Sequence, residues 1–192
     1  MKNLPIKNII DRPITLIGIM GAGKTTLGKR LAKQLNLEFF DSDLEIEDFA
    51  GCTIKTIFER QGEQAFRNIE QKVLAQLLSG SNRVIATGGG AFINPDTRLL
   101  IKEKTISIWL KTNLNLAMSR VEGRDKRPLL NNVDIRKKLD QIINQRNPIY
   151  AEADITIDSE DIPHDQMISR LLYAVAEYSG IQSRQMKTRE PD

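Results

Sequence analysis

The chain has 192 residues, of which 40% are hydrophobic, a length and composition that fit one globular domain with its own core. Its formal net charge of +3 is a modest basic excess, from which we infer no nucleic-acid binding. One cysteine and one histidine exclude an intramolecular disulfide, a cysteine-rich metal site and a histidine-based triad.

A phosphate-binding loop is the first strong feature. An apolar run at residues 14–17 predicts a short buried strand, and Leu27, Leu31 and Leu35 repeat with the spacing of a helix. Between them, residues 18–25 read G-I-M-G-A-G-K-T, which matches G-x-x-x-x-G-K-[S/T]. The glycines let the backbone curl around phosphates, and the start of the helix attracts the anion. A glycine-rich turn is the alternative, but the strand and helix on either side favour nucleotide binding.

Two acidic residues lie at the end of the second predicted strand, residues 37–41: Asp41 is its last residue and Asp43 follows it. Ser42 is expected to open a helix, with Glu45 completing a capping box. Asp41 and Asp43 then lie at the carboxyl end of a parallel strand, where open α/β sheets bind ligands. Both could be simple caps. Beside a phosphate loop, one could instead hold the Mg²⁺ shell and the other accept a proton from an alcohol.

The next helical region, residues 53–78, is divided at Gly62. Within it, Arg67 has Glu63 four residues before it and Glu70 three residues after it. This set could be an exposed ion-pair ladder of little energetic value. It could equally hold a guanidinium rigid to bind a substrate carboxylate.

Glycines 88–90 follow the third predicted strand, residues 83–87. They form either a flexible turn or a backbone that must approach a ligand closely. Asn94 and Pro95 are expected to begin the next helix, and residues 105–110 form the fourth strand.

The rest of the chain continues the alternation of helices and strands. Asn113 is expected to cap a helix, after which a polar stretch at residues 122–134 predicts a mobile lid over the nucleotide. The helix from residue 135 is expected to end at Pro148. A fifth strand at residues 155–157 and a last helix at residues 167–178 complete the pattern.

This order predicts a three-layer α/β/α sandwich around a five-stranded parallel sheet. We expect one domain over residues 1–180, with substrate-binding helices at about 42–79, and a disordered tail over 181–192. No stretch approaches the roughly 18 apolar residues of a membrane span, and residues 1–12 lack the apolar core of a signal peptide. A cytoplasmic monomer without membrane partners is the expectation.

Six sequence motifs, in a fixed order along the chain, closely resemble those of shikimate kinase. The resemblance extends from about residue 14 to residue 178. The motifs are Gly18 to Thr25, Asp41-Ser42-Asp43, Phe66-Arg67 with Glu70, Gly88-Gly89-Gly90, Arg127-Pro128-Leu129-Leu130, and Arg146-Asn147-Pro148 with Tyr150. The resemblance implies a P-loop kinase fold with a lid and transfer of the γ-phosphoryl group of ATP to the 3-hydroxyl of shikimate.

The resemblance also implies where ATP binds. Lys24 would contact the β and γ phosphates, Thr25 would bind Mg²⁺, and Asp41 would hold that ion through water. Arg120 would lie beside adenine, with residues 158–163 as a loosely matched adenine loop. Arg127 in the lid would reach the phosphate in the closed form. The implied ATP-binding residues are Gly21, Ala22, Gly23, Lys24, Thr25, Thr26, Arg120 and Arg127.

For shikimate, the resemblance implies a site opposite the phosphate loop. Asp43 would bind the hydroxyls and is the candidate base, so that Asp43, Lys24 and Arg127 form the implied catalytic set. Arg67 and Arg146 would bind the carboxylate, with Glu70 orienting Arg67. The remaining implied contacts are the backbone of Gly88, Gly89 and Gly90 and an apolar wall of Phe58 and Phe66.

Other functions stay as alternatives. A gluconate kinase shares the phosphate loop, but it should show His-Pro soon after the second aspartate, where this chain has Leu44-Glu45-Ile46-Glu47. The base-recognition features of a nucleoside monophosphate kinase are not evident, and the N-K-x-D motif of a GTP-binding switch protein is absent from the sequence. A nucleotide-dependent assembly protein would turn over ATP without an added acceptor.

Overall fold

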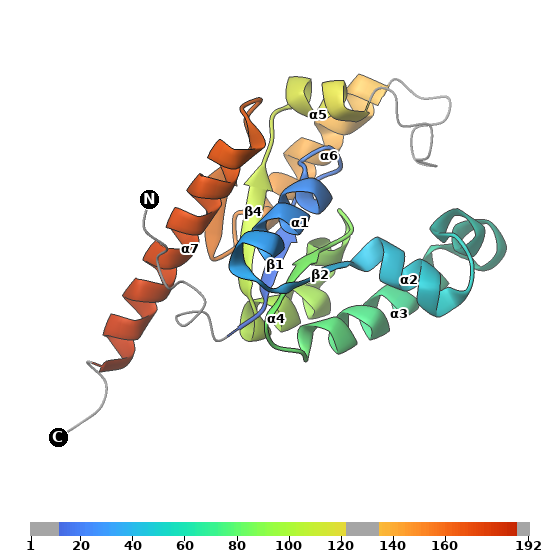
Figure 1. The fold of residues 1–192 in the computed structure, drawn as a ribbon. Coiled ribbons are helices and arrows are strands. Elements are labelled where there is room, and N and C mark those ends of the chain that lie inside the picture. Colours follow the sequence, from blue (N-terminus) through green and yellow to red (C-terminus); the bar gives the residue numbers. More distant parts are fainter. Residues whose placement is uncertain (1–11, 122–134, 188–192) are drawn as a thin grey trace.

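A parallel sheet forms the centre of the molecule (Figure 1). The computed structural model describes residues 12–121 and 135–187, with the backbone alone described for 181–187. Five strands pair in the order β2-β3-β1-β4-β5, and every pair is parallel. Their bounds are β1 Ile14–Ile17, β2 Glu38–Asp41, β3 Arg83–Ala86, β4 Ile106–Lys111 and β5 Ile155–Asp158.

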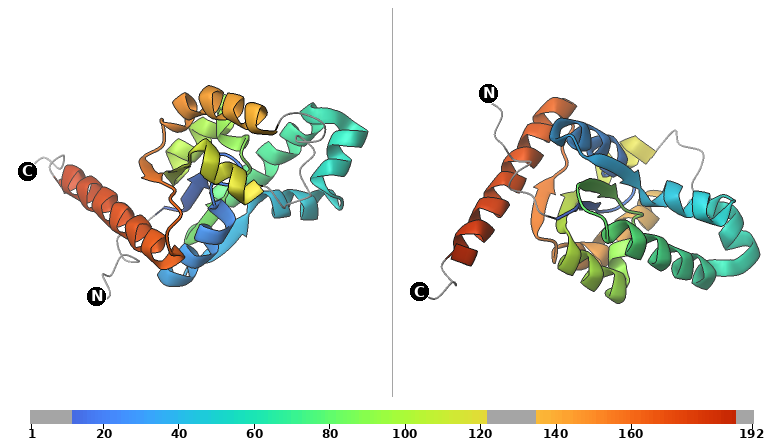
Figure 2. Two further views of the ribbon diagram at one scale, coloured as in Figure 1. Left: turned by 90° about the horizontal axis from the view of Figure 1, so that it is seen from above. Right: turned by 60° about the horizontal axis from the view of Figure 1, so that its bottom comes forward.

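Helices cover both faces of the sheet (Figure 2). Their bounds are α1 Lys24–Leu35, α2 Ser42–Ala50, α3 Ile54–Leu78, α4 Pro95–Lys104, α5 Leu114–Val121, α6 Ile135–Tyr150 and α7 His164–Lys187, with a short 3₁₀ turn η2 at Ala91–Ile93. The predicted three-layer sandwich and five-stranded parallel sheet are therefore confirmed.

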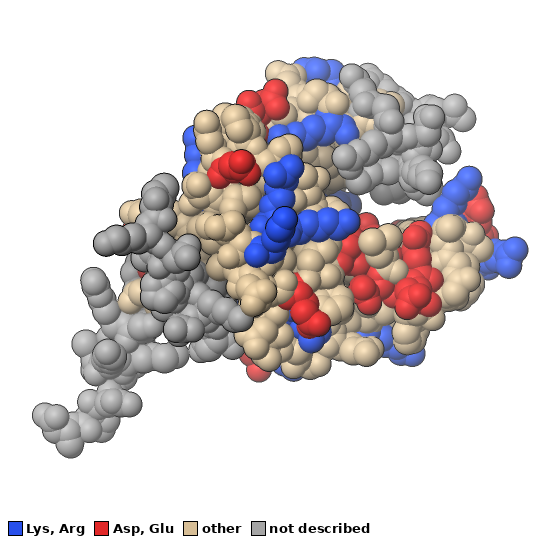
Figure 3. All heavy atoms as spheres, viewed as in Figure 1, with Lys and Arg blue, Asp and Glu red and all other residues tan. Residues whose placement is uncertain are grey.

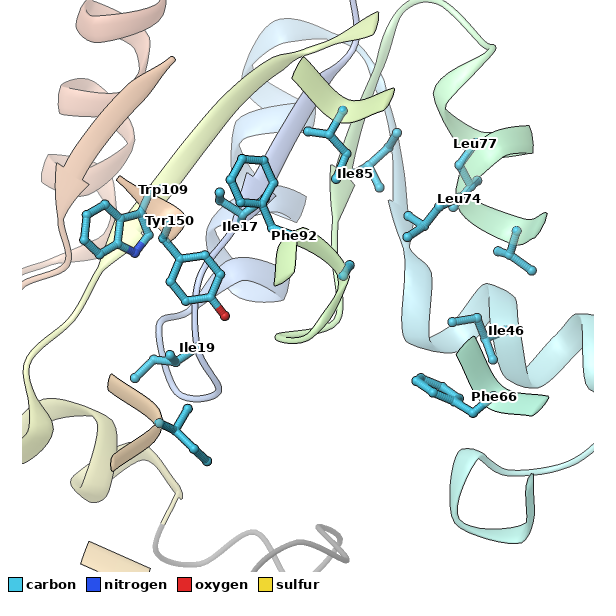
Figure 4. Packing of buried hydrophobic residues seen from close by; sticks show 14 of the residues in the cluster. Ile17, Ile19, Ile46, Phe66, Leu74, Leu77, Ile85, Phe92, Trp109 and Tyr150 are labelled. Atoms are coloured by element: carbon cyan, nitrogen blue, oxygen red, sulfur yellow. The ribbon is translucent and has the colours of Figure 1, made fainter. Parts of the chain in front are cut away.

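Two hydrophobic clusters, one on each side of the sheet, make the core. Side chains alternate along a strand, so Ile17 of β1 packs into one cluster and Leu16 into the other. The first cluster joins α3, α4 and α6 to the sheet and is shown in Figure 4. The second joins α1 and α7, with Leu31 and Leu171 fully buried within it.

The segment formed by α2 and the first half of α3 projects from the body as an arm (Figures 1 and 2). Within α3, the backbone departs from helical geometry at Gly62, where φ is 80° and ψ is 177°. The predicted division of this region at Gly62 is thus confirmed. Asn94 and Asn113 accept from the backbone N–H groups of Thr97 and Leu116, as expected of helix caps.

The predicted helix end at Pro148 is wrong, because α6 continues to Tyr150. A proline in the last turn removes one N–H donor, and the following turn is closed by the N–H of Ala151, which donates to the Asn147 carbonyl at 2.9 Å. The last helix also differs from its prediction. It begins at His164 and runs to Lys187, so it enters the tail that we expected to be disordered.

No helix in residues 12–121 and 135–187 combines the length and the apolar character needed to cross a membrane.

Candidate active site

The predicted site residues gather at the carboxyl ends of three neighbouring strands. Strand register places Leu16 of β1 beside Ala86 of β3, and Ala86 beside Asp41 of β2. The phosphate loop, the acidic turn and the glycine turn therefore leave the sheet from one edge. A cleft runs along this edge, lined by the phosphate loop, Asp41, Asp43, Gly89, Arg120 and residues 159–162.

The phosphate loop depends on glycines for its shape. Gly18, Gly21 and Gly23 have φ values of 136°, 78° and 92°, which L side chains rarely adopt. Space is short as well, since a Cβ on Gly18 would lie 2.8 Å from the Leu110 carbonyl oxygen. The ammonium of Lys24 donates to the carbonyls of Gly18 and Ile19, both at 2.8 Å, and so lies across the loop.

The first turn of α1 lies at the base of this loop. Gly23 precedes the helix and offers no side-chain cap to its N–H groups. N–H groups at a helix start, together with the helix dipole, attract an anion. The loop can therefore hold a phosphate between Lys24 and these backbone donors.

Asp41 links the phosphate loop to the acidic turn. One carboxylate oxygen accepts from the Thr25 hydroxyl at 2.6 Å, and the other accepts from the Asp43 N–H at 3.1 Å. Asp41 is therefore the N-cap of α2, and the predicted capping box of Ser42 and Glu45 is wrong. Ser42 is fully buried and its hydroxyl accepts from the Gly88 N–H at 2.9 Å, so it ties α2 to the glycine turn instead.

In the glycine turn, Gly88 and Gly90 must be glycines because there is no room for a side chain, and not because the backbone adopts a positive φ. Positive φ values in the described chain do not include residues 88–90. A Cβ on Gly88 would lie 2.6 Å from an Asp43 carboxylate oxygen, and one on Gly90 would lie 2.8 Å from the Arg67 guanidinium. The turn thus lies against two predicted site residues, Asp43 and Arg67, and its approach to a ligand stays a prediction.

Arg67 is held by two carboxylates, as the sequence suggested. Its guanidinium bonds Glu70 at 2.6 Å and Glu63 at 3.1 Å. The Glu70 side chain is only 3% exposed, so the pair is no surface ladder. Burial raises the pKa of the Glu70 carboxyl, with Asp43 and Glu63 adding to the rise and Arg67 opposing it. Burial lowers the pKa of Arg67, but the bonds to Glu70 and Glu63 outweigh it and the net shift is upward.

Two aromatic rings lie beside Arg67. The centroids of Phe58 and Phe66 are 4.7 Å apart, and the Arg67 guanidinium lies 5.0 Å from the Phe66 ring centre. The break at Gly62 separates the helical turns that carry the two rings. Phe58 and Phe66 therefore form a tilted pair of rings next to a cation, and their role as an apolar wall for the substrate stays a prediction.

Arg146 reaches the glycine turn from α6. Its guanidinium donates to the Gly89 carbonyl at 2.8 Å, and the Tyr150 hydroxyl donates to the same oxygen. The sequence assigned no role to Tyr150, which was named only as part of the motif that begins at Arg146. Nothing in local spacing reveals this contact, since Gly89 and Tyr150 lie far apart in the chain.

Arg120 joins the phosphate loop to the segment after β5. It donates to the Gly21 carbonyl at 3.3 Å, to the Ser159 hydroxyl at 2.9 Å and to the Glu160 carbonyl at 3.1 Å. Ser159, which the sequence did not single out, donates in turn to the Ala22 carbonyl at 3.1 Å. Its only sequence signal is its position in the predicted adenine loop.

Charges of opposite sign meet on the outer surface at this edge. Figure 3 shows the acidic residues of α2 beside the basic residues of α1. The predicted lid at residues 122–134, with Arg127, lies outside the described residues.

Comparison with known proteins identifies the family. The family model of shikimate kinase matches residues 20–176. A shikimate kinase from Rhodopseudomonas palustris is 48% identical over 168 residues, which are 88% of this chain and 83% of that protein. Among solved structures, a shikimate kinase from Acinetobacter baumannii in complex with shikimate has a TM-score of 0.84 and 39% identity, covering 86% of this chain and 93% of that one.

A gluconokinase from Sinorhizobium meliloti matches with a TM-score of 0.60, covering 91% of this chain and 97% of that one. Its 13% identity shows a shared fold and nothing more. With the family model matching most of the chain and relatives near half identical, the chain belongs to the shikimate kinase family and is an ATP-dependent kinase that acts on shikimate.

Proposed function

We propose that the cleft binds ATP on the phosphate loop and shikimate on the glycine turn, and transfers the γ-phosphoryl group to the 3-hydroxyl of shikimate. One observation carries this assignment. The glycine turn is packed between Asp43, Arg67 and Arg146, while Gly89 also borders the phosphate loop. A hydroxy acid lying there meets carboxylate and guanidinium groups at once, next to the donor phosphates.

The nucleotide half of the site consists of Gly21, Ala22, Gly23, Lys24, Thr25, Thr26 and Arg120. Lys24 would exchange the Gly18 and Ile19 carbonyls for phosphate oxygens, which are stronger acceptors because they are charged. Arg120 already joins the loop to residues 159 and 160, so it would border the base.

Thr25 and Asp41 are the proposed Mg²⁺ residues. Their oxygens lie 2.6 Å apart, and such hard oxygen donors suit an ion that keeps waters and phosphates as its other ligands. Within the described ranges, no group of three or more His, Cys, Asp and Glu could hold a metal without the nucleotide. Held by Thr25 and Asp41 together with the nucleotide, Mg²⁺ would supply positive charge that neutralises part of the phosphate charge.

The acceptor half consists of Asp43, Arg67, Glu70, Arg146, Gly88, Gly89, Gly90, Phe58 and Phe66. Arg67 and Arg146 supply the charge-assisted donors that a carboxylate needs, and Glu70 fixes the Arg67 guanidinium. Asp43 would orient the attacking hydroxyl and accept its proton. Transfer of the γ-phosphoryl group needs little covalent help, so positioning and charge neutralisation by Lys24 carry most of the catalysis.

Arg127 stays a predicted catalytic residue that would contribute positive charge on closure of the lid. The monomeric state, the cytoplasmic location and the absence of nucleic-acid or membrane partners also stay predictions. Size-exclusion chromatography with light scattering would test the first of them.

The deciding experiment measures ADP release from Mg-ATP by the purified protein. Shikimate, gluconate, AMP and no acceptor are compared in parallel. We expect release with shikimate alone. Release with gluconate would show that the acceptor is a different hydroxy acid. Release without any acceptor would indicate an ATPase.

A further inference from the structure

The carbonyl of Gly89 receives two hydrogen bonds from one helix. The Arg146 guanidinium donates at 2.8 Å, and the Tyr150 hydroxyl, one helical turn further along α6, donates as well. We propose that Tyr150 is a positioning residue of the acceptor site, whose hydroxyl fixes the Gly89 peptide and the Arg146 guanidinium that donates to the same carbonyl. This inference rests on the proposed role of Arg146 in binding the shikimate carboxylate.

Tyr150 cannot easily move away from this contact. It is only 1% exposed, and its ring packs 6.0 Å from the ring of Trp109 and 6.4 Å from that of Phe92, between centroids (Figure 4). A buried hydroxyl must find an acceptor or lose free energy, and the Gly89 carbonyl is the acceptor available here. The aromatic packing thus fixes where the hydroxyl lies.

Two donors on one carbonyl fix the peptide plane. A carbonyl oxygen has two acceptor positions, and Arg146 and Tyr150 occupy both at Gly89. Because the C=O and N–H of a trans peptide point in opposite directions, the N–H of Gly90 is turned away from α6. Neither Gly89 nor Gly90 has a side chain that could restrain the peptide between them. Without the Tyr150 hydroxyl, Arg146 would be the one of these two donors that still holds it.

Gly89 also touches the nucleotide half of the site. A Cβ built on it would lie 3.5 Å from the Gly18 carbonyl oxygen and 3.6 Å from the Met20 nitrogen. Movement of this peptide therefore changes the space between the acceptor and the phosphate loop. Tyr150 thus bonds the peptide that lies between the phosphate loop and α6.

The continuation of α6 past Pro148 makes this arrangement possible. Arg146 and Tyr150 are four residues apart, which places them on one face of a helix. Had the helix ended at Pro148, as its sequence predicted, no regular geometry would align the two donors.

The test is the variant Tyr150→Phe, which removes the hydroxyl and keeps the ring. We expect the KM for shikimate to rise several-fold to about tenfold, the scale of one lost hydrogen bond beside a charged group. The KM for ATP should stay within about twofold. The Kd for shikimate without nucleotide, followed by the fluorescence of the single tryptophan, should rise by the same factor as the KM.

Two control variants separate positioning from loss of stability. Tyr178→Phe removes a hydroxyl that donates to Asp154 outside the site, and it should leave both KM values unchanged. Phe92→Leu loosens the packing of Tyr150 without removing its hydroxyl, so it should lower the melting temperature while raising the KM for shikimate by a smaller factor than Tyr150→Phe does. Equal rises in both KM values for Tyr150→Phe, or a matching KM change in Phe92→Leu, would overturn the proposal.

A double-mutant cycle with Arg146→Lys tests whether Tyr150 acts through Arg146. If it does, the double variant has a KM close to that of Arg146→Lys alone. Multiplicative effects of the two changes would overturn the inference. An unchanged KM in Arg146→Lys would instead overturn the assignment of Arg146 itself, whereas an unchanged KM in Tyr150→Phe alone overturns only the role given to Tyr150.

Discussion

Asp43 lies where a single carboxylate can decide turnover. A Cβ on Gly88 would come within 2.6 Å of its carboxylate, so Asp43 borders the glycine turn within the cleft that the phosphate loop also lines. We expect Asp43→Asn to lower kcat by about 10²- to 10⁴-fold, the usual contribution of a general base, and to leave the Kd for ATP unchanged. Asp48→Asn, on the exposed side of the same helix, is the control. Near-normal turnover of the Asp43 variant would remove it as base and positioner.

Arg67 is expected to bind substrate and transition state alike. Arg67→Ala should therefore raise the KM for shikimate by about 10- to 100-fold with a smaller effect on kcat. Steady-state kinetics with saturating ATP measure this, with Lys55→Ala as a control because Lys55 is exposed and pairs with the exposed Glu59. An unchanged KM would mean that Arg67 serves only the ion pairs with Glu63 and Glu70.

Glu70 makes stability depend on pH in a defined direction. Burial raises its pKa in the folded state above the ordinary 4.5, so the folded protein binds the proton more tightly than the unfolded chain does. The stabilisation from Glu70, relative to a Glu70→Gln variant, is then fully present below pH 4.5. It is lost as the pH rises through the folded-state pKa. Urea unfolding of both proteins between pH 4 and pH 8 measures the difference, and a difference that grows with pH would contradict this origin.

At the scale of the element, the break in the helix of the arm requires a glycine. Gly62 has φ 80° and ψ 177°, a region almost restricted to glycine, and a Cβ there would meet nothing within 4 Å. Gly62→Ala should therefore cost about 1–3 kcal/mol of unfolding free energy through backbone strain alone. Gly180→Ala is the matched control, since Gly180 is helical and equally open, and that change should be neutral or stabilise by up to about 1 kcal/mol. Equal effects in chemical denaturation would argue against strain at Gly62.

The sequence predicted the helices and strands more accurately than the hydrogen bonds that join one to another. The glycine positions of the phosphate loop, the Asn94 and Asn113 caps and the break at Gly62 were predictable because local backbone geometry dictates them. Asp41 and Ser42 are both good capping residues, so only the structure could show which one caps α2 and which one binds Gly88.

Other contacts were beyond sequence reasoning for a different reason. The hydroxyls of Ser159 and Tyr150 bond carbonyls that are remote in the chain, and no local period encodes such pairs. The length of α6 depends on the burial of Tyr150, which outweighs the propensity of Pro148 to end a helix.

At the scale of the whole molecule, Asp154, just before β5, joins β4 to the last helix. Its carboxylate accepts from the N–H and hydroxyl of Ser107 at 2.8 and 2.7 Å, and from the Tyr178 hydroxyl at 2.8 Å. Asp154→Ala would leave buried donors on Ser107 without an acceptor, at a cost of about 1–3 kcal/mol in unfolding free energy.

The measurement is urea unfolding, with steady-state kinetics beside it. Both KM values should stay unchanged because Asp154 is outside the site. Asp165→Ala is the control, since Asp165 is 96% exposed in its pair with Arg30 and should change stability by less than about 0.5 kcal/mol. A comparable loss in both variants would show that the Asp154 bonds contribute nothing particular.

The position of the arm between β2 and β3 has a consequence for how substrate choice can change. Asp43, Phe58, Phe66, Arg67 and Glu70 all come from one continuous stretch of chain, whose ends join two neighbouring strands of the sheet. The donor machinery comes from elsewhere, on α1, α5 and the segment after β5. Replacing this one segment, by recombination or by grafting, would therefore change five of the proposed acceptor contacts at once. The nucleotide-binding residues, the glycine turn and Arg146 would stay in place.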